Sequence, residues 1–277
     1  MGQPHTRTGC LLGGAGAVLS LLLLAGCSSQ KAGRVVGGTY TLAGPYALGQ
    51  NVRISSPHGQ LVVRGGTSAT ALSAAFTPFV DDAPSNDEGA QAIADGLSYV
   101  VDTSGNTIVV SVSIASGALA GLGADIAVGL PSSFNGGIEL EQHDGPIDAE
   151  LVGTPSYTTI NSTQGAVSVA GAAGQLDITV GAGDCTLGVV GWSPSDGAVD
   201  VTSGQLAFAV GSGLSGKIDA EAGAAVAGPS PLPAGWTETV VGATHKSYVF
   251  GAAAAQMGTV SLAAPNAAAV ITITQQP

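Results

Sequence analysis

The chain has 277 residues, of which 45% are hydrophobic, 9% charged and 4% aromatic. The charged share is far below that of ordinary soluble domains while the apolar share is normal, which argues against disorder and predicts a folded core of small and branched side chains. The formal net charge of −12 makes nucleic acid and anionic lipid surfaces poor partners for this chain.

The first thirty residues have the features of an export signal. Arg7 precedes an apolar stretch over residues 11–24 that is too short to span a bilayer comfortably, and small residues follow it. The letters "LAGC" that end at Cys27 resemble the bacterial lipobox, in which the cysteine is acylated and becomes the first residue of the mature protein. An ordinary signal peptide that ends near a cysteine is the alternative.

The lipobox resemblance divides the chain into three parts. It implies a lipoprotein signal peptide over residues 1–26, an acylated N-terminus and tether over residues 27–50, and a folded domain over residues 51–277. The lipid on Cys27 would hold the chain on a membrane. Two serines and no aspartate follow Cys27, as in lipoproteins sent to the outer membrane, where the domain would lie on the periplasmic side or at the cell surface.

A glycine-led unit organises the rest of the sequence. Each unit is a glycine followed by alternating polar and apolar residues, which predicts a turn and then a short strand with one face buried. With small changes in length, the unit recurs at Gly59, Gly105, Gly137, Gly145, Gly165, Gly174, Gly183, Gly197, Gly204, Gly216 and Gly258. We expect a further strand near residues 39–42, where the tether ends.

The spacing of these strands predicts the fold class. Short, self-similar strands with small side chains are typical of a parallel β-solenoid, in which each strand stacks on the equivalent strand of the next coil. The intervals between the glycines are irregular, so a β-sandwich is the alternative. One stretch, residues 84–97, has helical spacing with a capping candidate at Ser85 or Asn86, and predicts a short helix that covers an end or side of the domain.

The order of the pieces resembles a known family. The stretch "VGLPSSFNGGIELEQHDGPI", in which a strand leads to Leu130 and Pro131 and then into two glycine-led units, is similar to the putative-adhesin family of bacterial envelope proteins. The resemblance covers residues 52–273. It implies a parallel β-solenoid without catalytic residues, acting as an adhesin-like or structural interaction module with an envelope protein or a polysaccharide as partner.

A nucleotide site is suggested by "AVGSGLSGKI" and then excluded. Gly211, Gly213 and Gly216 match a dinucleotide fingerprint, and Lys217 adds most of a phosphate-binding loop. Both motifs need a helix after the glycines, whereas "KIDAEAG" follows with the alternation of a strand. Ile218 also stands where a phosphate loop needs serine or threonine. We therefore expect neither a nucleotide nor any other cofactor.

Acidic residues are the remaining candidates for chemistry. Four aspartates occupy similar outward positions in the repeats, and stacking in register would make them a weak Ca²⁺-binding ladder: Asp148, Asp177, Asp200 and Asp219. Solvated outward faces are the simpler interpretation. A carbohydrate-active β-helix enzyme, a polysaccharide lyase or hydrolase, is the alternative function, although residues 65–216 contain no lysine or arginine that would complete such a site.

The cysteine and tryptophan residues of the domain predict structural roles. Cys185 lies in an alternating segment, which favours a buried thiol over a reactive one. Trp192 and Trp236 lie in proline-containing turns, where they are more readily interpreted as covers over the core than as exposed binding aromatics. Isolated histidines at 58, 143 and 245 do not have the spacing of a zinc site.

Overall fold

The computed structural model describes residues 33–65, 68, 70–151, 153, 155–191, 196–251 and 258–276. The candidate lipid site Cys27, the signal peptide and Trp192 lie outside these residues. The chain divides into residues 1–30 and residues 31–277, and the second unit contains everything that follows. The described residues form an all-β structure with a single helix, and none of their helices has the length and hydropathy to cross a membrane.

Two large sheets, named A and B, contain the strands. Sheet A runs in the order β1 (Val35–Val36), β5 (Ala71–Val80), β8 (Leu122–Leu130), β4 (Leu61–Gly65), β10 (Ile147–Glu150), β12 (Val167–Ala172), β14 (Cys185–Val189), β16 (Leu206–Val210), β22 (Val270–Gln275), β18 (Ala225–Ala227), with β2 (Tyr40–Pro45) also on β5. Sheet B runs in the order β19 (Trp236–Val240), β20 (His245–Phe250), β17 (Gly216–Ala222), β21 (Thr259–Ala264), β15 (Gly197–Ser203), β13 (Gln175–Ala182), β11 (Tyr157–Gln164), β9 (Ile138–Asp144), β3 (Asn51–His58), β7 (Thr107–Ile114), β6 (Leu97–Asp102).

The chain alternates between the two sheets, so that a strand of sheet B followed by a strand of sheet A forms a strand pair. From β9 to β16 each pair lies beside the next pair along the chain, with parallel partners in both sheets. Equivalent apolar residues then lie in register, as Ile147 does with Val167 and Cys185 with Leu206. The inward side chains of both sheets pack into one core, because period-two alternation directs every second residue inward.

Strand order departs from chain order at both ends of the sheets. The pair β3 and β4 lies between β7 and β8 on one side and β9 and β10 on the other. The last pair, β21 and β22, is inserted between β15 and β16 and the earlier β17 and β18. Sequential stacking, expected from the glycine repeat, therefore holds in the middle of the sheets and fails near their ends. Because β3, β4, β21 and β22 each lie between two other strands, both of their edges have hydrogen-bonding partners.

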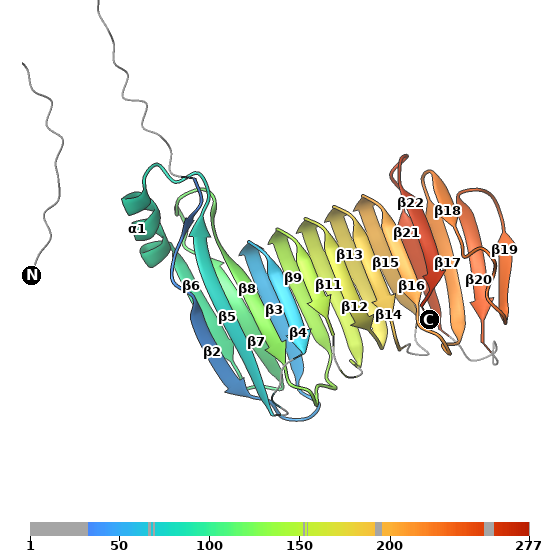
Figure 1. Ribbon diagram of the computed structural model, residues 1–277, viewed down its shortest axis with the longest axis horizontal. Coiled ribbons are helices and arrows are strands. Elements are labelled where there is room, and N and C mark those ends of the chain that lie inside the picture. The colour runs from blue at the N-terminus through green and yellow to red at the C-terminus, as the bar shows by residue number, and fades with distance from the viewer. Residues whose placement is uncertain are drawn as a thin grey trace, which may run out of the picture. The chain divides into compact units, whose positions relative to one another are not determined.

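Antiparallel strands and the helix cover one end of the two sheets, here called the first end, where β5 and β6 lie (Figure 1). Strand β5 pairs antiparallel with β8, β6 with β7, and β1 and β2 with β5. The predicted helix is confirmed as α1 (Asn86–Gly96), with Ser85 as its N-cap accepting a hydrogen bond from the backbone N–H of Glu88. Strand β1 starts at Val35, so regular structure begins inside the segment that the sequence assigned to the tether.

The hairpin of β19 and β20 covers the other end of sheet B. It pairs antiparallel with β17, and Trp236 stacks on Phe250 with ring centroids 4.5 Å apart. Trp236 is only 8% exposed and belongs to the main core. Its expected role as a cover is confirmed.

The predicted turns also have a structural counterpart. A glycine with positive φ stands between the two strands of five pairs, and consecutive members of this row pack against each other: Gly59, Gly145, Gly165, Gly183 and Gly204. The row forms one edge of the core and fixes where each chain segment passes from sheet B to sheet A.

Candidate functional site

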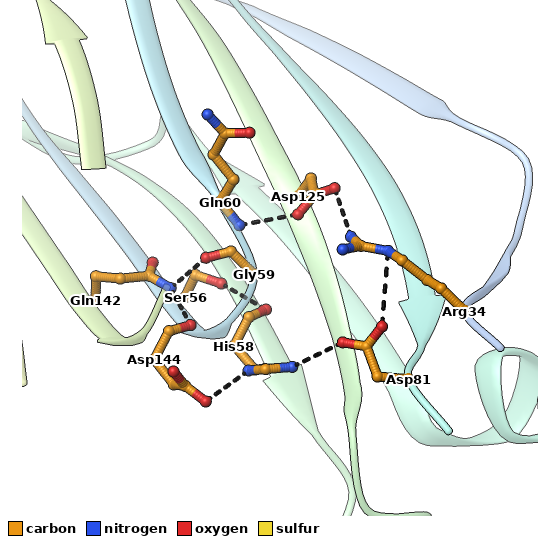
Figure 2. A network of polar contacts seen from close by, with 9 residues as sticks. All are labelled: Arg34, Ser56, His58, Gly59, Gln60, Asp81, Asp125, Gln142 and Asp144. Atoms are coloured by element: carbon orange, nitrogen blue, oxygen red, sulfur yellow. Dashed lines mark hydrogen bonds and ion pairs between the residues drawn. The ribbon is translucent and has the colours of Figure 1, made fainter. Parts of the chain in front are cut away.

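A network of charged side chains lies where Arg34, just before β1, approaches the row of glycines at Gly59 (Figure 2). Arg34 donates from Nη2 to Oδ2 of Asp125 at 2.7 Å, and its Nε lies 3.9 Å from Oδ1 of Asp81. The imidazole of His58 lies between two carboxylates, with Nε2 3.5 Å from Asp81 and Nδ1 3.0 Å from Asp144. Each of the three carboxylates thus faces a guanidinium or an imidazole.

Backbone contacts hold this network in place. The N–H of Gln60 donates to Oδ1 of Asp125 at 2.9 Å, so the glycine turn itself supports one carboxylate. Buried Gln142 donates from Nε2 to the carbonyls of Gly59 and Asp144 at 2.7 and 2.8 Å (Figure 2). The guanidinium of Arg34 lies 3.6 Å from the centre of the Phe79 ring.

We call the network of Arg34, His58, Asp81, Asp125 and Asp144 the clamp. A cavity of about 250 Å³ lies between these side chains. Because the acidic groups are already paired with Arg34 and His58, the network joins the N-terminal segment to β5, β8 and the turns that follow β3 and β9. Half-exposed ion pairs contribute only about 1 kcal/mol each, so the network adds little to stability and mainly holds Arg34 beside Asp125, Asp81 and the Phe79 ring.

The outer face of sheet B is the second candidate region. Neighbouring parallel strands place polar side chains in register, and the longest such row is Ser111, Ser55, Glu141, Asn161, Thr179 and Asp200. A groove of about 440 Å³ opens on this face beside β3, β9 and β11. Its outward lining is formed by Ser55, Pro57, Glu141, His143, Asn161 and Thr163.

A second polar cluster lies on the same strands as the groove, closer to their first residues. Arg53 donates to Glu139, and Tyr157 donates from its hydroxyl to Oε1 of Glu139 at 3.1 Å. The hydrogen bond to Glu139 raises the pKa of Arg53, whereas burial and then Glu139 raise the pKa of Tyr157. A Cβ on Gly137 would lie 1.9 Å from the Tyr157 ring, so the ring packs directly on that backbone. The outer face of sheet B therefore combines an aromatic ring with donors and acceptors of hydrogen bonds.

The four aspartates of the expected ladder are not brought together. Asp148 lies in sheet A and is paired with Arg64, while the other three lie in sheet B. Asp177 is in register with Ala198, and Asp200 with Thr179. Asp219 lies three strands from Asp177, about 14 Å at the usual spacing. Within the described ranges, no group of three or more carboxylate, imidazole and thiol side chains could hold a metal ion.

Asp219 instead fastens the end hairpin. It accepts hydrogen bonds from Ser247 at 2.7 Å and from His245 at 2.9 Å, and these two contacts, with Ser247 the larger cause, lower its pKa. Both partners bind the same carboxylate oxygen, so a serine–histidine relay is not what these contacts form. Glu238 similarly accepts from Lys246 and Tyr248 across the hairpin, and its pKa is lowered by them.

Two further predictions are tested by the structure. Cys185 is a free thiol that is 1% exposed, and burial raises its pKa to about 12, as expected of a structural cysteine. In "AVGSGLSGKI", Gly211 and Gly213 lie in the turn between β16 and β17, and the predicted strand begins at Gly216.

Sequence reasoning missed the clamp and the groove. The sequence offers no role for the isolated His58, whose side chain is half-buried between Asp81 and Asp144. One signal was available, because His58 and Asp144 each precede a glycine of the repeat and are in register in adjacent strands. Arg34 and Asp125 carry no such signal, since their proximity depends on the strand order.

Comparisons with known proteins give distant likenesses. No protein-family profile matches the sequence, and no curated protein matches it either. A putative cell adhesion protein from Clostridium sporogenes is 13% identical, with a TM-score of 0.47 over 86% of this chain and 100% of that one. A putative adhesin from Bacteroides fragilis is 10% identical, with a TM-score of 0.26 over 86% of this chain and 97% of that one. At these scores neither protein assigns a function to this chain.

Proposed function

We propose that this chain is a lipid-anchored, non-catalytic envelope protein, adhesin-like in character, whose parallel β-solenoid binds a polysaccharide through the outer face of sheet B. The anchor is the acylated Cys27, and the outer membrane is the proposed location.

The solenoid rests on how strand pairs follow one another. From β9 to β16, each step along the chain adds one strand to sheet B and one to sheet A, with parallel partners and equivalent residues in register. Such stepwise addition is expected of coils wound about a common core and supports the solenoid proposal. The antiparallel strands at the ends act as caps.

The polar rows on sheet B carry the binding proposal. Parallel strands lie about 4.8 Å apart, so a row of side chains in register presents hydrogen-bonding groups at a regular interval. An extended chain of hydroxyl-bearing units can use such a row one unit after another. Glu141 and Asn161 supply acceptors and a donor beside the groove. Tyr157, half-buried at the start of β11, is an aromatic side chain of the kind on which sugars pack.

The absence of catalysis is proposed from the state of the carboxylates. A glycoside hydrolase needs one carboxylic acid whose pKa is raised so that it remains protonated. Among the described carboxyl groups, the shifts that are resolved, at Asp102, Asp219 and Glu238, all lower the pKa. Hydrogen bonds to the charged form cause each of them.

Two measurements test this proposal. Replacing Cys27 with alanine should move the protein from the membrane fraction to the soluble fraction, and a variant that stays membrane-bound would contradict the anchor. The secreted Cys27→Ala chain should sediment with insoluble peptidoglycan or chitin without releasing reducing ends. Release of reducing ends would favour the carbohydrate-active enzyme instead.

A further inference from the structure

Most of the exposed large apolar side chains among the described residues lie at the two ends of the sheets, and Val190, just after β14, is the exception. At the first end they lie on β1 and β2, in the turn after β2 and on β6: Val36, Tyr40, Leu42, Leu48 and Val100. At the other end they lie on β19, just after it and in the loop before it: Leu232, Val240 and Val241. The two groups differ in their distance along the chain from Cys27.

Two residues of the first group lie on the outer strand that covers the core at this end. Tyr40 and Leu42 are opposite Phe76 and Ala74 in the antiparallel pair of β2 and β5, and directly opposed residues point to the same side of a sheet. Phe76 and Ala74 are fully buried, whereas Tyr40 is 54% exposed and Leu42 41%. Tyr40 stacks on Tyr99 of β6 with ring centroids 5.5 Å apart. These side chains are therefore the outermost layer of the core at this end.

The segment that contains β1 and β2 carries no charged side chain. Residues 35–52 contain no lysine, arginine, aspartate or glutamate. Exposed edge strands commonly carry charged side chains that prevent pairing with other chains, so an uncharged apolar edge is a liability unless something covers it. We call Tyr40, Leu42 and the rest of β2 the anchor-side edge.

The length of chain before Gly33 limits what can cover this edge. The six steps from Cys27 to Gly33 span at most about 21 Å when fully extended. Arg34 follows at once and is held by Asp125, Asp81 and the Phe79 ring. An acyl chain on Cys27 must lie in a bilayer, so the lipid surface has to lie near the end of the sheets that carries β1 and β2.

We infer that the anchor-side edge rests on the lipid interface as a second membrane contact, a proposal that itself depends on the anchor at Cys27. Tyrosine is suited to this position, since its ring is apolar and its hydroxyl remains in water. Leu42 adds apolar area beside it. The nearby acids of α1, Asp87, Glu88 and Asp95, favour neutral over anionic headgroups.

The test uses the full acylated chain in vesicles of phosphatidylcholine and phosphatidylethanolamine. A fluorophore is attached at Leu42→Cys in one variant and at Val240→Cys in the other, and lipids with spin-labelled headgroups quench it. Cys185 remains unlabelled because it is buried and its pKa is raised. Val240 is the matched control, because it is an apolar strand residue that is 58% exposed on β19, the terminal strand of sheet B at the other end from β6.

We expect the Leu42 probe to be quenched at least about twofold more strongly than the Val240 probe. Equal quenching in vesicle-bound protein would overturn this inference and leave the anchor intact, whereas failure of the acylated chain to bind vesicles would overturn the anchor. Burial of the Leu42 probe in a dimer of the Cys27→Ala chain would assign the edge to a second copy and also overturn the inference.

Discussion

Gly145 packs directly beneath the carbonyl group of Gly59, the glycine of the adjacent strand pair. A Cβ on Gly145 would lie 1.8 Å from that carbonyl oxygen and 2.7 Å from its carbon, and the φ of Gly145 is +131°. Space and backbone conformation thus both require glycine there. The neighbouring members of the row repeat this contact, which fixes how closely the strand pairs approach each other.

Gly145→Ala should be strongly destabilising. The methyl group clashes with backbone that cannot move without separating two strand pairs, and the positive φ adds strain, so we expect a loss of about 3 kcal/mol or more in the free energy of unfolding. Gly49→Ala is the control, because Gly49 has φ +84° but no atom within 4 Å of the added Cβ, and should lose only about 1–2 kcal/mol. Urea unfolding measures both. Equal losses would show that packing between glycines is unimportant.

The two buried hydroxyl groups of β11 should contribute differently to the free energy of unfolding. Thr158 donates to the carbonyl of Ala173 at 3.0 Å and accepts from its N–H at 3.4 Å, whereas the hydroxyl of Ser162 is buried without a partner. Thr158→Val should therefore cost about 1–3 kcal/mol, because it leaves buried groups of Ala173 unpaired. Ser162→Ala should cost nothing or stabilise the fold. Thermal melting of both variants decides, and a larger loss for Ser162→Ala would contradict the assignment.

Alkaline pH should destabilise the fold through buried acids. Burial raises the pKa of the Cys185 thiol from its ordinary 9.0 to about 12, and that of the Tyr99 hydroxyl from 10.0 to about 12. Between those values the unfolded chain releases protons that the folded chain retains, so the free energy of unfolding falls as pH rises. Urea unfolding from pH 8 to pH 11 should show this fall, and Cys185→Ala should make it shallower. If Cys185→Ala leaves the dependence of the free energy of unfolding on pH unchanged, the Cys185 thiol does not contribute to it.

Acid should loosen the end hairpin before the middle of the sheets. Contacts with Lys246 and Tyr248 lower the pKa of Glu238, and contacts with Ser247 and His245 lower that of Asp219. The stability that these contacts give is present above the unfolded pKa values and is lost as pH falls through the lowered ones. Protection of the backbone amides against hydrogen exchange should therefore fall more in β19 and β20 than in β13 as the pH is lowered below about 4. A uniform loss of protection across sheet B would contradict this expectation.

Local structure could be predicted from the sequence because each signal is local. The alternation in "GKIDA" and "LAFAV" depends only on residues two apart, and β17 and β16 follow from it. The helix likewise follows from Ser85 and the acids of the first turn. Burial of Cys185 and Trp236 could be predicted for the same reason.

Strand order could not be predicted, because alternation does not identify a strand's neighbours. Nothing in the residues of β22 distinguishes a place beyond β18 from its observed place between β16 and β18. The ladder of aspartates was expected from similar positions in the repeats, yet Asp148 lies in the other sheet from Asp177. The clamp of Arg34 and Asp125 joins residues 91 positions apart, and depends on β8 lying beside β4 and β5.

The most direct test of the proposed function compares the outer faces of the two sheets. Glu141→Ala with Asn161→Ala removes adjacent polar groups from sheet B, and Ser168→Ala with Thr186→Ala removes an equivalent in-register pair from sheet A. Co-sedimentation of the Cys27→Ala chain with insoluble peptidoglycan or chitin gives an apparent affinity for each variant. We predict that the sheet B variant binds about tenfold more weakly while the sheet A variant binds as the parent does. Equal binding by the two variants, or no retention of the parent, would contradict a polysaccharide-binding role for this face.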